Sequence, residues 1–161
     1  MPSATAPAVR KAPAARPAAS PLGALLTVAN APRIGPQPKS LDKALACAQH
    51  WVQLSDARRP DAMWLEAGMM MQRMVPRAEW VRYIRKIRLD RGVLVGREWF
   101  EMARVRDPVG LPAGDYLNVI FLAHYAKAVM FETVSLAPGT EGWLPVGYVI
   151  RPVQREISFV Q

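Results

Sequence analysis

Two charged residues occupy positions where the sequence pattern predicts the interior of a sheet. Arg97 falls on the apolar phase of the alternating segment 93–105, and Glu132 falls on the apolar phase of the segment 127–136. Because an isolated buried charge is too costly to keep, the two should pair or line a wet cavity. A pair would brace the sheet, whereas a cavity would make Glu132 a base or a ligand anchor. Arg97 and Glu132 are therefore the candidate polar pocket or buried ion pair.

Other residues give little support for catalysis. The sequence has no phosphate-binding loop, dinucleotide-binding turn, nucleophile elbow or zinc-protease motif. Cys47 and His50 are three residues apart on a predicted helix, but two ligands without a third do not predict a metal site. His124 has no carboxylate of the same strand phase nearby, which favours a surface or interface histidine. We therefore predict no catalytic residue, no metal and no cofactor, and lean against an enzyme.

Basic charge suggests a third function. The chain of 161 residues has a net charge of +8, and residues 77–91 carry six basic side chains against two acidic ones. With Trp80 interleaved, such a helix could bind nucleic acid or anionic lipid. Trp80 lies on the apolar stripe of this helix, however, and cannot both pack in a core and stack on bases. A basic-surface nucleic-acid binder is therefore the least favoured hypothesis.

The first 40 residues differ in composition from the remainder. They contain eight of the 15 prolines, no aromatic residue and no acidic residue. This composition predicts a disordered, basic, Ala/Pro-rich tail or an export leader. An apolar run at 21–31 ends in Ala29-Asn30-Ala31, as a secretory signal does, but Pro32 opposes cleavage there. We expect a periplasmic or exported protein, or alternatively a cytoplasmic one with an uncleaved tail, and no membrane span.

Residues 41–152 predict one α+β domain, followed by a C-terminal extension at 153–161. Ser40 is a good N-cap for a first helix, and Pro60 and Pro76 open further helices. After Gly92 the apolar period changes to two, which is typical of strands. The pattern predicts two to three N-terminal helices packed on one face of a curved four-stranded antiparallel sheet. The strands are expected at 93–105, 116–125, 127–136 and 143–150.

The opposite face of that sheet is predicted to carry large apolar side chains. Monomers rarely leave such a patch open to water, so we expect a homodimer or a protein partner to cover it. The candidate interface consists of Leu94, Phe100, Met102, Ile120, Leu122 and Phe131.

Several short motifs resemble a bacterial family, the domain of unknown function 4019. The opening resembles it through Trp51, Leu54, Asp56 and Trp64, and the resemblance covers roughly residues 42–151. Its closing motifs are Leu111-Pro112 to Tyr116, Glu132-Thr133-Val134-Ser135-Leu136, Gly142-Trp143 and Gly147-Tyr148-Val149-Ile150. The chain departs from the family pattern at Arg58, Pro60 and Met63, between Asp56 and Trp64.

The resemblance implies a small bacterial protein, often exported, with a cone-shaped fold similar to the nuclear-transport-factor-2-like (NTF2-like) or cystatin-like architecture. It implies no activity. We therefore expect a non-catalytic binding or assembly module, with the cell envelope as its setting. The alternative is a small enzyme or ligand binder that uses a polar cavity around Arg97 and Glu132.

Overall fold

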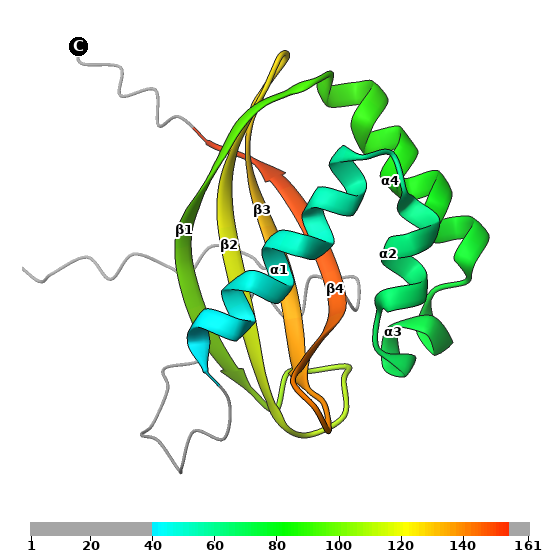
Figure 1. Cartoon of the computed structure of the whole chain (residues 1–161), viewed down its shortest axis with the longest axis vertical. Helices are drawn as coiled ribbons and strands as arrows, with labels where there is room; N and C mark the ends of the chain where they lie inside the picture. The colour runs from blue at the N-terminus through cyan, green and yellow to red at the C-terminus, as the bar shows by residue number, and fades with distance from the viewer. Residues whose placement is uncertain (1–39, 155–161) are drawn as a thin grey trace, which may run out of the picture.

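Helices precede strands along the part of the chain that the computed structural model describes, residues 40–154 (Figure 1). The predicted tail at 1–39 and most of the C-terminal extension lie outside the described residues. The α+β class and the order of helices before an antiparallel sheet are confirmed. The elements are α1 (Leu41–Asp56), α2 (Pro60–Glu66), α3 (Met69–Met74), α4 (Arg77–Arg91), β1 (Leu94–Arg106), β2 (Asp115–Tyr125), β3 (Val129–Pro138) and β4 (Trp143–Pro152).

Helix α1 is defined at both ends by local hydrogen bonds. Ser40 is its N-cap, and the Ser40 hydroxyl accepts a hydrogen bond of 3.2 Å from the Asp42 N–H. At the other end, the Arg59 N–H donates to the Leu54 carbonyl and the Arg58 N–H donates to the Ser55 carbonyl. This pair of bonds is a Schellman motif, and Arg58 takes its left-handed position with φ 58°. The α1–α2 turn therefore places an arginine where glycine is usually found.

The second predicted helix is in fact two. The apolar stripe predicts one helix from Pro60 to Val75, but α2 and α3 are separated by Ala67 and Gly68. The Gly68 N–H donates to the Pro145 carbonyl of β4 at 2.8 Å. The side-chain amide of Gln72 then donates to the carbonyls that the break frees. The interruption is therefore stabilised by a distant strand and one side chain, so the count of helices rises to four in residues 40–154.

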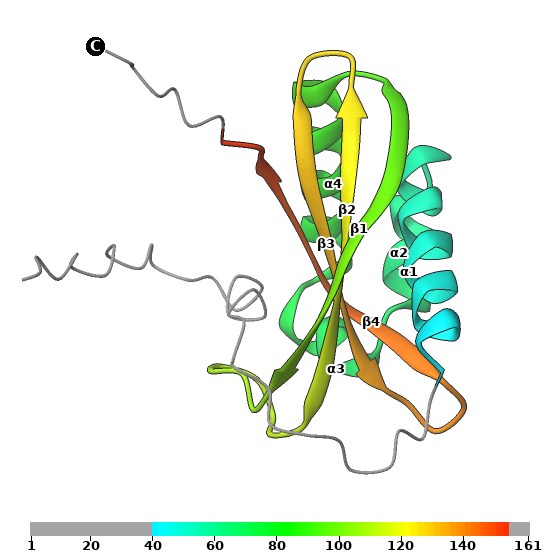
Figure 2. The same cartoon turned by 90° about the vertical axis from the view of Figure 1, so that its left-hand side faces the viewer.

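The four strands form an antiparallel meander in the order β1-β2-β3-β4. Figures 1 and 2 show the helices on one side of the sheet, and a strong twist along its length. Helix α1 packs across β2, β3 and β4, and α2 packs against both α1 and α4. We call the helix-covered side the inner face and the opposite side the outer face. None of the helices in residues 40–154 is long and apolar enough to cross a bilayer.

Aromatic side chains fill the space between the helices and the inner face. Trp51 of α1 stacks on Trp80 of α4, with ring centroids 5.4 Å apart. Trp51 also meets Tyr148 of β4 edge to face at 6.4 Å. All three side chains are fully or almost fully buried. Large buried aromatics supply much of the apolar area that stabilises so small a domain.

Two irregularities in β1 change which side chains face inward. Register shifts occur between Leu94 and Gly96, and between Trp99 and Glu101. Each β-bulge adds one residue and reverses the alternation. Our strand phase for β1 was therefore right at Arg97 and wrong at Leu94 and Met102, which lie on the far sides of the two bulges. Two predicted interface residues are corrected for this reason, since Leu94 and Met102 pack against inner-face clusters.

Candidate functional site: a buried charge network

Arg97 and Glu132 are joined directly on the inner face. The Arg97 Nε donates to Glu132 Oε2, and its Nη2 donates to Glu132 Oε1 at 3.2 Å. Arg97 pairs with Ala123 on β2, whereas Glu132 pairs with Phe121, two positions earlier on that strand. The arginine thus crosses the intervening strand diagonally beside the small Ala123 side chain.

Asp56 is the second carboxylate bound to Arg97. The two guanidinium Nη atoms donate to Asp56 Oδ2 at 2.6 Å and to Oδ1 at 3.0 Å. Such two-point contacts between arginine and carboxylate are among the stronger hydrogen bonds in proteins. Asp56 is the last residue of α1, where a negative charge opposes the helix dipole. Its contacts with arginine offset that unfavourable position.

Arg88 of α4 completes a row of alternating charges. Its Nη2 donates to Asp56, and its Nε donates to the Ser55 hydroxyl at 3.3 Å. The guanidinium also lies over the Tyr125 ring, 5.9 Å from the centroid. The row Arg88–Asp56–Arg97–Glu132 runs from the surface into the core. The side chains of Arg88 and Asp56 are 20% and 24% exposed, that of Arg97 is 10% exposed, and that of Glu132 is 1% exposed. The row has no net charge.

Two tyrosines close the inner end of this row. The hydroxyls of Tyr125 and Tyr148 each donate to Glu132 Oε1 at 2.5 Å. The buried carboxylate thus accepts hydrogen bonds from an arginine and from two phenols. With these tyrosines, the network takes one residue from α1, one from α4 and one from each of the four strands. We call these six residues the charge network: Asp56, Arg88, Arg97, Tyr125, Glu132 and Tyr148.

The electrostatics keep Arg97, Tyr125 and Tyr148 in their donating forms. Burial lowers the pKa of Arg97, but the hydrogen bonds from Arg97 to Asp56 and Glu132 outweigh burial and raise the pKa above its ordinary value. Burial, and then the charge of Glu132, raise the pKa of both Tyr125 and Tyr148 well above the ordinary tyrosine value. The guanidinium therefore stays charged and the phenols stay protonated at neutral pH.

This arrangement suits a structural brace better than acid–base chemistry. A general base must reach the proton that it removes, and it needs a free lone pair. Glu132 is buried, and its carboxylate already accepts four hydrogen bonds. The solvent-facing end is Asp56 with Arg88, which line a hollow beside α4. Of the two hypotheses for Arg97 and Glu132, these contacts favour the ion pair.

The remaining candidates lie apart from the charge network. His50 pairs with Glu66 at 2.7 Å, whereas the Cys47 thiol donates to the Trp143 carbonyl at 3.4 Å. Burial, and then the charge of Glu66, raise the pKa of the Cys47 thiol, which disfavours the reactive thiolate. Within residues 40–154, no group of three His, Cys, Asp or Glu side chains could hold a metal ion. His124 is exposed on β2.

The outer face holds the other four predicted interface residues. Phe100 is 54% exposed, and its ring lies 5.0 Å from the Phe131 ring, centroid to centroid. Ile120 and Leu122 are half-buried beside them on β2. These four side chains form an apolar patch on the outer face, the side of the sheet that the described helices leave uncovered.

Trp80 of α4 is fully buried and stacked on Trp51, so it cannot stack on nucleic-acid bases.

The family comparison agrees with the motifs found in the sequence. The family model described as "Protein of unknown function (DUF4019)" matches residues 47–148. The chain belongs to this family. The match includes all six residues of the charge network, from Asp56 to Tyr148. Neither the curated proteins nor the solved structures give a match.

Four members of the charge network were not predicted as site residues. Asp56 and Tyr148 stand in the family motifs quoted above, which was the available signal for them. Arg88 belongs to the basic helix 77–91 and also to an Arg…Gly…Arg segment typical of the family, here Arg88, Gly92 and Arg97, while Tyr125 is only the end of a predicted strand. Their roles depend on how α1 and α4 pack on the sheet, and sequence spacing alone does not give that packing.

Proposed function

We propose that this protein is a non-catalytic binding or assembly module and that the outer face of its sheet is the binding surface. One row of cross-strand neighbours carries the proposal. It runs Glu98–Leu122–Phe131–Arg151 across β1, β2, β3 and β4. The row is acidic at one edge, apolar in the middle and basic at the other edge. Phe100 adds a half-exposed ring to the apolar middle.

A second copy of the chain is the partner that this row fits best. A two-fold axis parallel to the strands would place β1 of one protomer over β4 of the other. Glu98 of each protomer would then face Arg151 of its partner, and the apolar residues would meet in the centre. A two-fold interface buries the same patch twice, so one row supplies both halves of the complementarity. Face-to-face packing of two sheets is a common way to cover such surfaces.

The test is the mass of the protein in solution, measured by sedimentation equilibrium over a range of concentrations. We expect a monomer–dimer equilibrium for the wild type, and we expect Phe131→Asp to shift it strongly toward monomer. Val109→Asp is the matched control, because Val109 is 82% exposed in the β1–β2 connection, away from the row. A wild type that stays monomeric at the highest soluble concentration would contradict the homodimer.

Charge reversal tests the orientation of the two copies. Glu98→Arg and Arg151→Glu should each weaken the dimer, because like charges then face each other across the interface. The double variant restores opposite charges and should recover most of the wild-type affinity. If the double variant is as weak as the two single changes combined, β1 does not lie over β4 in the dimer.

We further propose that the module works in the bacterial cell envelope. The support is the sequence pattern of residues 1–40, in which Arg10, Lys11 and Arg16 precede an apolar run that ends in an Ala-x-Ala triplet. Mass spectrometry of the mature N-terminus tests this directly. A chain that begins after residue 31 would support export, whereas an intact N-terminus would support the cytoplasmic alternative.

The finer architecture is also a proposal. The order of helices and strands, the twisted sheet and the family match are consistent with the NTF2-like or cystatin-like cone that the resemblance implies. A crystal structure of residues 40–154 would test it by comparison with both architectures. A flat, open sheet in that structure would argue against a cone.

A further inference from the structure

A hollow of about 720 Å³ lies between the end of α1, the α1–α2 turn and the C-terminal half of α4. Its size falls in the range of small-ligand sites. Three arginines line it, Arg58, Arg85 and Arg88, together with the carboxylate of Asp56. Asp56 is already bound by Arg88 and by Arg97. The hollow therefore carries an excess of positive charge.

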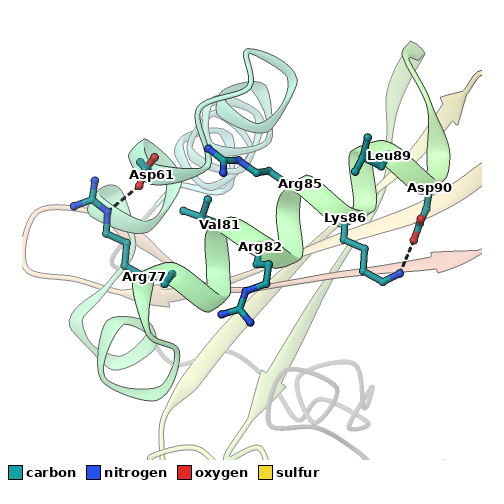
Figure 3. A pocket seen from close by; sticks show the side chains of 9 residues that line it. Asp61, Arg77, Val81, Arg82, Arg85, Lys86, Leu89 and Asp90 are labelled. Carbon is teal, nitrogen blue, oxygen red and sulfur yellow. Dashed lines mark hydrogen bonds and ion pairs between the residues drawn. The ribbon is translucent and has the colours of Figure 1, made fainter.

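Two of these arginines are free to bind a ligand. Arg58 and Arg85 are exposed, and neither makes an ion pair with any residue in the described range 40–154. Two other basic residues of α4 are engaged in ion pairs. On the outer side of α4, Arg77 pairs with Asp61, and Lys86 pairs with Asp90 (Figure 3).

Figure 3 shows how α4 presents Arg85. Arg85 and Arg82 point to different sides of the helix, with Val81 between them. Arg85 lines both the hollow and a shallow groove on the outer side of α4, and so does Leu89. The groove also has a second arginine that is unpaired within residues 40–154, Arg82, but Arg82 points to a different side of α4 from Arg85, whereas the hollow is lined by both Arg58 and Arg85 (Figure 3). An anion is therefore better held in the hollow than along the groove.

Four apolar side chains also line the hollow. Ile84 and Pro60 are buried beneath it, while Leu89 and Val93 are 78% and 71% exposed at its edge. Large aliphatic side chains this exposed, next to unpaired arginines, suit a ligand that has both a charge and a hydrocarbon part. A simple inorganic anion would leave Leu89 and Val93 in water.

We infer that this hollow binds an anionic amphiphile, with a phosphate or carboxylate held by Arg58 and Arg85 and a hydrocarbon chain laid on Leu89 and Val93. Guanidinium groups bind such oxyanions through paired hydrogen bonds. Covering the two aliphatic side chains removes apolar area from water. The inference is independent of the proposed dimer, because the hollow is on the helical side of the domain.

Isothermal titration of the full chain with dodecyl phosphate, kept below its critical micelle concentration, tests the inference. Binding should be at least tenfold tighter than for inorganic phosphate or for dodecyl maltoside, which lack the chain and the charge respectively. Arg85→Gln should weaken dodecyl phosphate binding at least tenfold. Arg58→Gly should do the same without a backbone penalty, since glycine suits the left-handed position. Arg73→Gln, an exposed arginine on α3, is the matched control and should bind as the wild type does.

The source of the amphiphile is distinguished by co-sedimentation with vesicles of phosphatidylglycerol and of phosphatidylcholine. Binding to phosphatidylglycerol alone, lost in Arg85→Gln, would assign the site to a lipid headgroup in a bilayer. Dodecyl phosphate binding without vesicle binding would assign it to a free amphiphile. Circular dichroism must show that each variant is folded. The inference is overturned if dodecyl phosphate does not bind, if dodecyl maltoside binds equally well, or if the folded Arg58→Gly and Arg85→Gln variants keep wild-type affinity.

Discussion

Arg97 of β1 and Glu132 of β3 meet across an intervening strand, although neither strand is hydrogen-bonded to the other. The contact is possible because Arg97 pairs on β2 with Ala123, which is fully buried. The methyl side chain of Ala123 leaves room for the arginine to pass. With Asp56 and Arg88, these two charges form a neutral row that ties both long helices to the sheet. The charge network therefore acts as a brace of the fold.

The size of Ala123 should accordingly be critical. Ala123→Leu would fill the space through which the arginine passes, and overpacking a core position costs about 1–3 kcal/mol. We expect at least that loss in the free energy of unfolding, measured by urea denaturation. Ala113→Leu, in the exposed connection between β1 and β2, is the control and should change stability by less than about 0.5 kcal/mol. Equal stability of the two variants would show that Arg97 does not need this space.

Stability should fall in alkaline solution because of the tyrosines in the network. The folded-state pKa of Tyr148 is raised above the unfolded value of about 10, so the unfolded chain loses its phenolic proton first. The stabilisation is complete below about pH 10 and is lost as the pH rises toward the folded value. The free energy of unfolding should then fall by up to about 1.4 kcal/mol per pH unit for this residue.

Tyr148→Phe tests that assignment. The variant should be less stable than the wild type at pH 8, because Glu132 loses a hydrogen-bond donor. Its stability should decline less steeply than that of the wild type between pH 10 and 11, since one titrating phenol is gone. Urea titrations at several pH values provide the slopes, and parallel slopes would exclude Tyr148 as a cause of the alkaline loss.

Arg58 should be a position where stability can be gained. Its φ of 58° is strained for a residue with a Cβ and suits glycine. Arg58→Gly should therefore raise the free energy of unfolding by about 0.5–1 kcal/mol. Arg59→Gly is the matched control, because Arg59 has a φ of −116° and gains nothing from glycine. Thermal denaturation compares the two, and a loss of stability in Arg58→Gly would mean that the arginine side chain contributes more than its backbone costs.

Apolar periodicity and turn residues were sufficient to predict most of the fold. Ser40, Pro60, Pro76 and Gly92 mark the boundaries of elements because their local chemistry restricts the backbone there. The break between α2 and α3 was missed because its stabilising partner, Pro145, is distant in sequence. The bulges of β1 were also missed, because the alternation of apolar and polar residues in a sequence does not reveal where a strand holds one extra residue.

The charge network shows the same division between local and distant information. Arg97 and Glu132 could be predicted because charges in an apolar pattern need partners. The other two charges of the row could not be predicted, because Asp56 reaches Arg97 and Arg88 reaches Asp56 only when the helices α1 and α4 are packed on the sheet. Asp56 was visible in a motif, but a motif does not say which charge a carboxylate will bind.

A double-mutant cycle on Arg97 and Glu132 tests the brace most directly, with urea denaturation of the wild type, Arg97→Met, Glu132→Gln and the double variant. Arg97→Met leaves Glu132 buried without its ionic partner and should cost about 3–5 kcal/mol. Glu132→Gln should cost less, because Arg97 keeps Asp56. The double variant should be more stable than the sum of the two losses predicts, with a coupling energy of at least about 1 kcal/mol. Single variants that each remain within about 0.5 kcal/mol of the wild type, with no coupling, would contradict the account.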